Sequence, residues 1–160
     1  MTIQVGDTLP DATLMEMTAN GPQPLSVKDL VAGKTVALFA VPGAFTPTCS
    51  AQHLPGFVTQ ADALKAKGID EIACLSVNDV FVMDAWGKAS NVGDAVRMLA
   101  DGNGDFAKAL GLDLDASGFG MGVRSQRFSL VAQDGKVTQL NVDEGGGFEV
   151  SAAEYMLDRL

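Results

Sequence analysis

The feature that most constrains the fold is a short apolar run that is followed at once by a turn, a cysteine and a helical pattern. Residues 36–41 read Val-Ala-Leu-Phe-Ala-Val, which is typical of a strand that is buried on both faces. Beyond the turn at 42–48, apolar residues recur at helical spacing from Leu54 to Ala66. We therefore expect the strand, the turn and the helix to meet at Cys49, in the first helical turn.

The predicted position of Cys49 has a chemical consequence. A free thiol is mostly protonated at neutral pH, whereas the N-terminus of a helix stabilises the thiolate, which is the nucleophile. Thr46 can direct its hydroxyl toward the sulfur, and Pro42 and Pro47 restrict the loop to few conformations. We interpret Cys49 as a reactive thiol. The alternative is a small apolar core residue beside ordinary turn prolines.

The same residues resemble the signature of a known family. Pro42, Thr46 and Cys49 form P-x-x-x-T-x-x-C, and the longer string V-P-G-A-F-T-P-T-C-S-x-x-H-L-P-G-F resembles the type-five, or plant type II, branch of the peroxiredoxins. The match is highly specific. It implies a thioredoxin-like fold and an antioxidant, thiol-dependent peroxidase that needs no metal and no organic cofactor.

The resemblance also implies a role for each matching residue. Cys49 matches the peroxidatic cysteine, which attacks hydrogen peroxide or an organic hydroperoxide and becomes a sulfenic acid. Thr46 matches the hydroxyl that holds the sulfur and the peroxide, and Pro42 matches the ring that shields the cysteine. Gly43 and Phe45 belong to the same string and are expected to line the pocket.

His53 is the only histidine, and it follows Cys49 by four residues, so that on a helix the two side chains share a face. A Cys–His ion pair would activate the thiol, but an (i, i+4) pair on one helix is not the geometry of cysteine peptidases. We favour a hydrogen-bonding His53 that lines the pocket without acting as a base.

Arg124 and Arg127 are the candidate cations, because an arginine stays protonated and can stabilise both a thiolate and a leaving oxygen. They lie an odd number of residues apart, so on a regular strand they point to opposite faces and one alone reaches the sulfur. The spacing does not choose between them. The string R-S-Q-R-F-S resembles the family segment in which the arginine before the phenylalanine assists catalysis, which selects Arg127.

Cys74 lies inside a second apolar run, at 71–77, and we interpret it as a core strand residue. Mid-strand placement puts it ~10 Å from the sheet edge where Cys49 is expected. A disulfide between them would require local unfolding, because bonded cysteines have Cα atoms within about 7 Å. Members of the family resembled here have a resolving cysteine either at this position or near the C-terminus, and this sequence has Val150 at the C-terminal position. If Cys74 is structural, the resemblance implies that an external thiol is the reductant, either glutathione with glutaredoxin or thioredoxin.

The remaining pattern predicts a mixed sheet. The strands at 36–41 and 71–77, joined by a helix that ends at Gly68, make a parallel βαβ unit. A strand at 127–133 turns at Asp134-Gly135 and returns antiparallel to it over 136–142. This is the layout of a thioredoxin-like α/β fold, with a mixed central sheet flanked by helices.

Four local features complete this prediction. Residues 12–17 suit an edge strand that is followed by a turn at 20–22, and Ser26 suits the cap of a short helix. Pro55 predicts a kink in the helix after Cys49. Ser151 and Glu154 read as a capping box that opens a last helix.

Length and charge exclude several classes of protein. The 160 residues suit one domain that spans 1–160, and 47% apolar with 19% charged residues are typical of a globular chain. A net charge of −9 argues against nucleic acid and anionic membranes as partners. With two cysteines and no long apolar run, we expect a cytoplasmic protein in a reducing environment.

Two rival functions use the same cysteine. A thioredoxin-type oxidoreductase is disfavoured because the chain has no C-x-x-C motif. A peroxide-sensing redox switch or holdase would use Cys49 without sustained turnover.

The family resemblance further implies a homodimer packed through loops near the active site.

Overall fold

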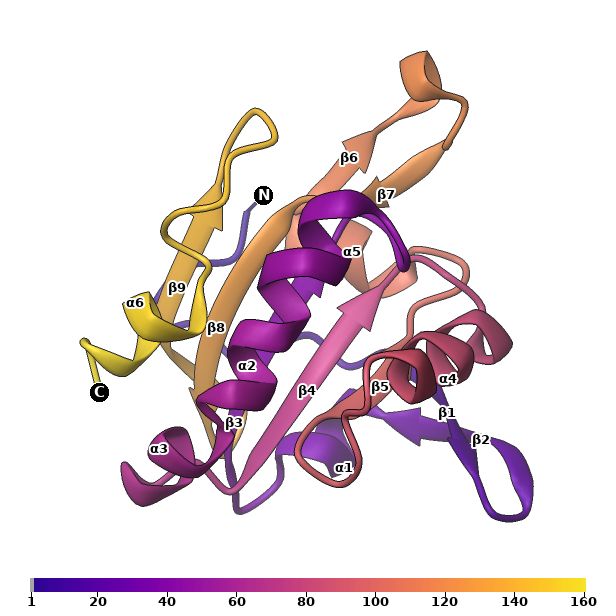
Figure 1. Ribbon diagram of the computed structural model, residues 1–160. Coiled ribbons are helices and arrows are strands. Elements are labelled where there is room, and N and C mark those ends of the chain that lie inside the picture. Colours follow the sequence, from indigo (N-terminus) through magenta and orange to yellow (C-terminus); the bar gives the residue numbers. More distant parts are fainter. Residues whose placement is uncertain (1) are drawn as a thin grey trace.

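The centre of the protein is a seven-stranded mixed sheet with helices on both faces, as Figure 1 shows for a computed structural model that describes residues 2–160. The strands lie in the order β2-β1-β5-β4-β3-β8-β9. Their bounds are β1 (Thr13–Thr18), β2 (Gly21–Ser26), β3 (Thr35–Val41), β4 (Glu71–Ser76), β5 (Arg97–Ala100), β8 (Arg127–Gln133) and β9 (Lys136–Asp143).

The middle of the sheet is made by the predicted apolar runs. β3 pairs in parallel with β4 and antiparallel with β8, so that Phe39 lies opposite Cys74 on one side and opposite Ser129 on the other. Both β3 and β4 are almost wholly buried, which explains their continuous apolar sequences. The predicted βαβ unit, the hairpin after it and the mixed α/β sheet flanked by helices are confirmed.

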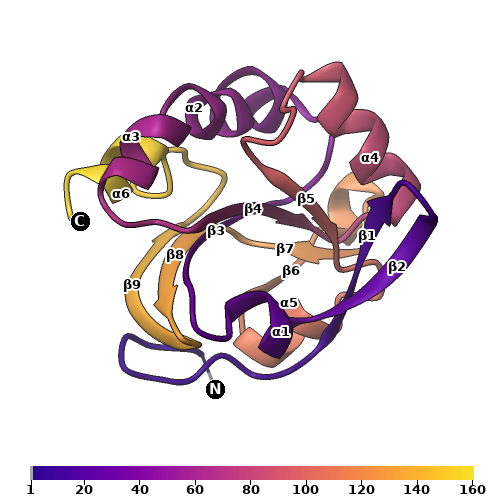
Figure 2. The same cartoon turned by 90° about the horizontal axis from the view of Figure 1, so that it is seen from below.

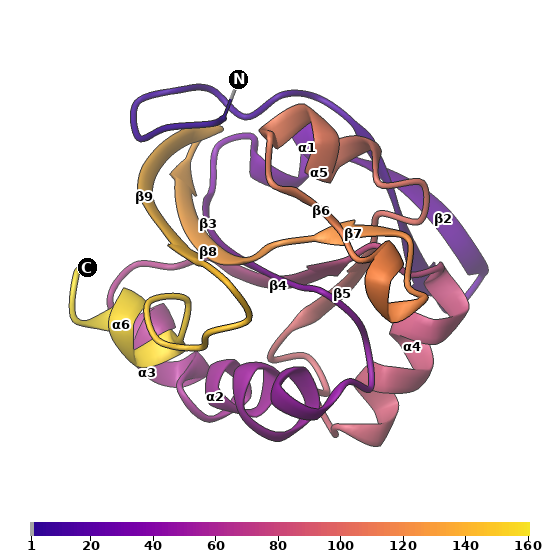
Figure 3. The same ribbon diagram turned by 90° about the horizontal axis from the view of Figure 1, so that it is seen from above.

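Two layers of helices cover the sheet (Figures 2 and 3). One face carries α2 (Leu54–Thr59), α3 (Ala61–Ala66), α4 (Val80–Ala89) and α6 (Ala153–Leu157), and the other carries α1 (Val27–Val31) and α5 (Asp105–Leu110). Alternate β3 residues serve the two cores: Phe39 packs on the α2 side and Leu38 on the α1 side. Across residues 2–160, no helix is both long and apolar enough to span a membrane.

The helix after β3 departs from α geometry where it carries the cysteine. A π-helical turn, η1 (Cys49–His53), precedes α2, and the Leu54 amide donates to the Cys49 carbonyl five residues back. Pro55 has no amide hydrogen to donate in an α-helix. A wider turn just before Pro55 therefore loses no hydrogen bond from residue 55. The irregularity expected at Pro55 therefore takes the form of a π turn at the cysteine.

A short two-stranded ribbon projects from the body of the protein (Figure 1). It consists of β6 (Asp113–Asp115) and β7 (Val123–Ser125), joined across the 3₁₀ turn η2 (Ser117–Phe119). The sequence pattern predicted neither strand, because each has only three residues and too little apolar alternation to be recognised.

The predicted edge strand at 12–17 is wrong in one respect. β1 lies between β5 and β2, and β2, a strand that the sequence did not predict, forms the edge. β2 escaped detection because it contains Pro22 and Pro24, which cannot donate to a ladder but are tolerated on an edge strand. The cap of α1 is confirmed, since the Ser26 hydroxyl accepts from the Asp29 amide at 3.0 Å.

The predicted capping box at the last helix is wrong. α6 begins after Ala152, which makes no side-chain cap hydrogen bond. The Ser151 hydroxyl donates instead to the carboxylate of Asp143, at the end of β9. A charged acceptor close by competes successfully with the helix amides for this hydroxyl.

Candidate active site

The sulfur of Cys49 is held by an arginine from a distant part of the chain. Cys49 lies in the first turn of its helix and is 0% exposed. Arg127, the first residue of β8, is 7% exposed and donates from Nη2 to Cys49 Sγ at 3.0 Å. Since β8 runs antiparallel to β3, the start of β8 meets the end of β3, from which the cysteine loop departs.

The other donors of Arg127 are also directed. Nη1 donates to Nδ1 of His53 at 2.9 Å, and the ring of Phe148 lies 5.8 Å from Cζ. The buried Nε has no hydrogen-bond partner among the described residues. One guanidinium thus contacts the sulfur, the imidazole and an aromatic face while keeping a buried donor unused.

His53 packs among aromatic rings beside Arg127. It is 0% exposed, and its ring centroid lies 5.0 Å from that of Phe39 and 5.1 Å from that of Phe148. Nε2 lies 3.0 Å from the Ser151 carbonyl oxygen. Burial, and then the positive charge of Arg127, lower the pKa of His53 to about 3. The imidazole is therefore neutral at physiological pH and makes its hydrogen bonds to Arg127 and Ser151.

The loop before Cys49 is closed by its own hydrogen bonds. The Thr46 hydroxyl donates to the Gly43 carbonyl at 2.7 Å, and the Ser50 amide donates to the Thr46 carbonyl at 2.9 Å. A Cβ on Gly43 would lie 3.1 Å from Thr46 Cγ2, so glycine lets the loop approach the threonine. Phe45 takes a positive φ of 63° and is 54% exposed, which places its ring at the mouth of the loop.

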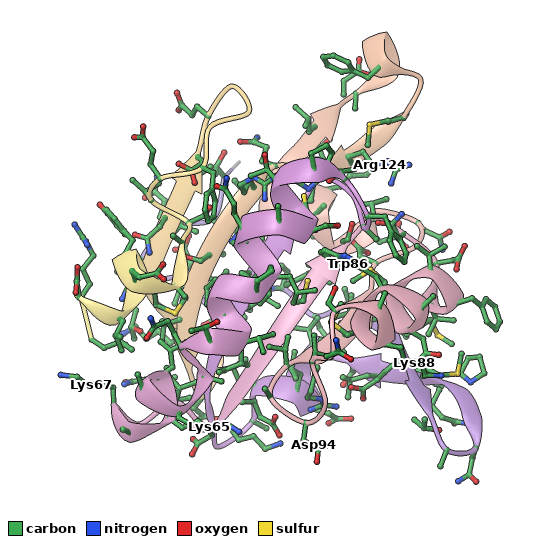
Figure 4. All side chains as sticks on the ribbon, in the orientation of Figure 1. Lys65, Lys67, Trp86, Lys88, Asp94 and Arg124 are labelled. Carbon is green, nitrogen blue, oxygen red and sulfur yellow. The ribbon has the colours of Figure 1, made fainter. Side chains whose placement is uncertain are left out.

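Neighbouring elements anchor the loop and the helix. Pro42 is half-buried at the end of β3, and the Ala44 amide donates to Asn78 Oδ1 at 3.0 Å. Trp86 of α4 donates from Nε1 to the hydroxyl of Ser50 at 3.0 Å, next to the cysteine (Figure 4). The helix that carries Cys49 is thereby attached to α4.

Arg124 does not contact the sulfur. Its Nε donates to the Met121 carbonyl at 2.8 Å and its Nη1 to the Val77 carbonyl at 3.0 Å, at the base of the β6–β7 ribbon (Figure 4). Arg127 is therefore the arginine that contacts Cys49, whereas Arg124 forms hydrogen bonds at the base of the ribbon.

Cys74 is the second free thiol, 0% exposed in β4. It shares a buried cluster with Cys49, on the α2 side of the sheet. Burial, and then the proximity of Cys49, raise the pKa of the Cys74 thiol well above its ordinary value. Within residues 2–160, His, Cys, Asp and Glu side chains form no group of three that could hold a metal ion.

Sequence reasoning missed Asp143 and Ser151 as part of the site. Asp143 ends β9, and Ser151 lies eight residues later beside His53. The only signal was the pairing of Ser151 with Glu154, which pointed to a helix cap instead. Contacts that span up to 98 residues cannot be found from local spacing.

Comparison with known proteins finds similar sequences and structures over almost the whole chain. The model of the Redoxin family matches residues 4–157. Peroxiredoxin-2C of Oryza sativa subsp. japonica is 55% identical, over 99% of this chain and 98% of that protein. A structure of reduced Prx3 from Vibrio vulnificus in complex with hydrogen peroxide is also 55% identical, with a TM-score of 0.95 over 99% of each chain. The chain belongs to the peroxiredoxins.

This membership confirms the resemblance seen in the motif. The peroxiredoxin is a thiol-dependent peroxidase, and hence an oxidoreductase. Its thioredoxin-like fold is further supported by a Burkholderia cenocepacia structure, described as a thioredoxin reductase, with a TM-score of 0.97 and 53% identity over 100% of this chain and 99% of that one.

Proposed function

We propose that Cys49 is the peroxidatic cysteine and reduces hydrogen peroxide and organic hydroperoxides. The observation that carries this is the 3.0 Å contact between Arg127 Nη2 and Cys49 Sγ, because a charged donor stabilises the thiolate. The thiolate attacks one peroxide oxygen and the O–O bond breaks. Cysteine becomes a sulfenic acid, and the second oxygen takes a proton and leaves as water or alcohol.

The residues around the sulfur divide the remaining work. Arg127 stabilises the negative charge that develops on the leaving oxygen, and its unused Nε–H is a donor that this charge can engage. The hydroxyl of Thr46 donates to Gly43, so its oxygen is directed as an acceptor for the peroxide proton. Pro42 and the exposed ring of Phe45 restrict access from solvent, and Gly43 and His53 complete the pocket.

We propose that an external thiol regenerates the enzyme. Cys74 lies in the middle of β4, paired with Phe39 on one side and Met98 on the other, and so it is a structural residue rather than a resolving one. A small thiol attacks the sulfenic acid, which releases water and leaves a mixed disulfide; a second thiol then frees Cys49. Glutathione with glutaredoxin is the first candidate, and thioredoxin is the second.

Intact mass spectrometry tests this cycle. Wild type and Cys74→Ser are each treated with one equivalent of hydrogen peroxide, with and without glutathione. We expect both proteins to gain one oxygen, and glutathione to convert that oxygen into a mixed disulfide. A loss of two hydrogens in wild type, with a gain of one oxygen in Cys74→Ser, would instead make Cys74 the resolving cysteine.

Turnover separates the peroxidase from a redox switch or holdase that uses Cys49. Substoichiometric protein is mixed with excess peroxide and either the glutathione–glutaredoxin or the thioredoxin system. Sustained consumption of peroxide is expected with the first system, and the ratio of the two rates identifies the reductant. Consumption of one equivalent per Cys49 with both systems would favour the switch.

We also propose a homodimer, because three aromatic rings on separate elements are exposed. Phe45 of the cysteine loop, Phe81 of α4 and Phe119 of the β6–β7 ribbon are 54%, 64% and 87% exposed. Exposed apolar side chains of this kind are common where a second chain packs. Analytical ultracentrifugation of wild type and Phe81→Ser tests this, with a shift of the variant toward monomer as the expected result.

A cytoplasmic location is the last part of the proposal. Both cysteines are free thiols, and a peroxidase regenerated by glutathione or thioredoxin requires a compartment that supplies reduced thiols. Cell fractionation with an antibody against the chain tests it. Enrichment in an oxidising compartment would contradict the proposal.

A further inference from the structure

A carboxylate that lies away from the cysteine organises the segment that reaches the site from the far side. Asp143 accepts hydrogen bonds from the amides of Glu149, Val150 and Ser151 at 3.0 to 3.1 Å, and from the Ser151 hydroxyl. These donors fold residues 144–151, here named the C-terminal turn, back onto the end of β9. One carboxylate thus accepts hydrogen bonds from four donor groups of the turn.

Ionisation of Asp143 supports this arrangement. Burial alone would raise the pKa of the carboxyl, but the hydrogen bonds from Ser151, Val150 and Glu149 outweigh burial and lower the pKa below its usual range. The carboxylate is therefore charged at neutral pH and accepts strongly. Asp143 lies opposite Arg127 in the β8–β9 register, yet its oxygens are occupied by the C-terminal turn.

The C-terminal turn determines the protonation pattern of His53. An arginine has no acceptor, so Nδ1 of His53, which lies 2.9 Å from Arg127 Nη1, must be the unprotonated nitrogen. The imidazole proton therefore resides on Nε2 and is donated to the Ser151 carbonyl at 3.0 Å. The Ser151 carbonyl thus selects the tautomer that can accept from the arginine.

Orientation of the imidazole then controls the arginine. A guanidinium is planar, so a fixed acceptor at Nη1 fixes the direction in which Nη2 points, which is toward Cys49 Sγ. Phe148, also in the C-terminal turn, packs 5.1 Å from the His53 ring and 5.8 Å from Arg127 Cζ. The same turn therefore contacts both members of the pair.

We propose that Asp143 is a positioning residue for the peroxidase reaction. Through the C-terminal turn and the neutral tautomer of His53, it aims the Arg127 guanidinium at the Cys49 sulfur and so determines the rate of the peroxide step. Asp143 contacts neither sulfur nor peroxide. The proposal rests on the function of Cys49 given above.

Kinetics of the isolated peroxide step test the proposal. Trp86, the only tryptophan, donates to Ser50 beside Cys49, so its fluorescence can follow oxidation in a stopped-flow experiment. Asp143→Asn should lower the rate constant with hydrogen peroxide roughly tenfold or more, because a misplaced charged donor loses transition-state stabilisation. It should also shift the rising limb of the pH–rate profile to higher pH, while the rate of the sulfenic acid with glutathione stays unchanged.

Asp101→Asn is the matched control. Asp101 is also a buried carboxylate that accepts two backbone amides, those of Phe106 and Ala107, but it anchors α5 on the other face of the sheet. We expect a loss of thermal stability without a change in the pH–rate profile. Equal kinetic effects of the two substitutions would reduce Asp143 to a structural role and overturn the proposal.

A double-mutant cycle tests whether Asp143 acts through His53. His53→Phe removes both ring nitrogens, so Asp143→Asn added to it should cause no further loss of rate. Additive losses would mean that Asp143 acts on Arg127 directly, and would overturn the proposal. Cys49→Ser separates the proposed function of Cys49 from the proposed role of Asp143. Retained turnover in Cys49→Ser would contradict the proposed function. Abolished turnover in Cys49→Ser, together with a normal rate in Asp143→Asn, would contradict the role of Asp143 alone.

A measurement on wild type avoids any dependence on the folding of variants. The single histidine of the chain makes its imidazole nitrogen signals unambiguous in ¹⁵N NMR. We expect one tautomer, protonated on Nε2, from pH 8 down to pH 5. A proton on Nδ1, or titration of the ring near the ordinary pKa of histidine, would overturn the proposal.

Discussion

Cys49 and Cys74 are equally inaccessible but have different surroundings. Both are 0% exposed, both are free thiols, and both belong to the buried cluster between the sheet and α2. Cys74 has apolar strand neighbours, and burial raises the pKa of its thiol. Cys49 lies in the first turn of a helix, with the Arg127 guanidinium 3.0 Å from its sulfur.

The difference in surroundings leads us to expect different reactivities from two equally buried thiols. Burial disfavours a thiolate unless charged or polar donors replace the lost water. Cys49 has such donors because β8 begins with an arginine and the helix begins beside it, whereas Cys74 lies in mid-strand. Substitutions of either thiol, of the arginine at Cys49, or of His53 behind that arginine test this difference.

Removal of each sulfur should give the largest contrast. Cys49→Ser should lower peroxide consumption to the uncatalysed background, because a serine hydroxyl is not ionised at neutral pH. Cys74→Ser should retain the rate of the peroxide step within about twofold, since Cys74 lies in β4 and the donor that contacts the Cys49 sulfur comes from β8. Stopped-flow rates with hydrogen peroxide check both, and a large loss in Cys74→Ser with an intact fold would end the distinction between the thiols.

Removal of each arginine should give the next largest contrast. Arg127→Gln should slow the peroxide step about 100-fold to 1,000-fold, which is the usual cost of losing one transition-state donor. Arg124→Gln breaks contacts to the Met121 and Val77 carbonyls and should leave that step nearly unchanged. Rate constants measured at saturating reductant check this, and similar losses in the two variants would contradict the assignment of the cation.

The two arginines also show how far the sequence could lead. The strand, turn and helix around Cys49 were predictable because each depends on residues within about 30 positions. Spacing could not choose between Arg124 and Arg127, and the family resemblance chose the one that meets the sulfur. The assumption of one regular strand failed, because Arg124 lies in β7 and Arg127 in β8, on either side of Gln126.

The groups behind Arg127 were beyond the reach of sequence patterns. His53 meets residues 74 and 98 positions away, and no local periodicity encodes such contacts. Ser151 has the pattern of a helix cap, but the carboxylate of Asp143 takes its hydroxyl. A propensity that is worth about 1 kcal/mol loses to a charge-assisted hydrogen bond of larger value.

Lowering the pH should reduce the free energy of unfolding through His53, which lies behind Arg127 at the Cys49 site. Its pKa is lowered to about 3, so between pH 6 and pH 4 the unfolded chain binds a proton that the folded chain does not. The contribution of His53 to the free energy of unfolding is thus complete above pH 6.5 and falls by roughly 1 kcal/mol per pH unit on acidification. Urea titrations from pH 7 to pH 4 should show a shallower pH dependence for His53→Gln than for wild type, and parallel curves would contradict this.

The smallest effect is expected on the free energy of unfolding when Cys74 is replaced by alanine or serine. Cys74→Ala leaves a small cavity in a packed core and should lower the free energy of unfolding by about 1 kcal/mol. Cys74→Ser keeps the size but buries a hydroxyl among apolar neighbours, and so should cost about 1 to 3 kcal/mol. Denaturant titration under reducing conditions measures both. If serine is tolerated better than alanine, Cys74 has a polar partner, and the contrast with Cys49 becomes one of degree rather than of kind.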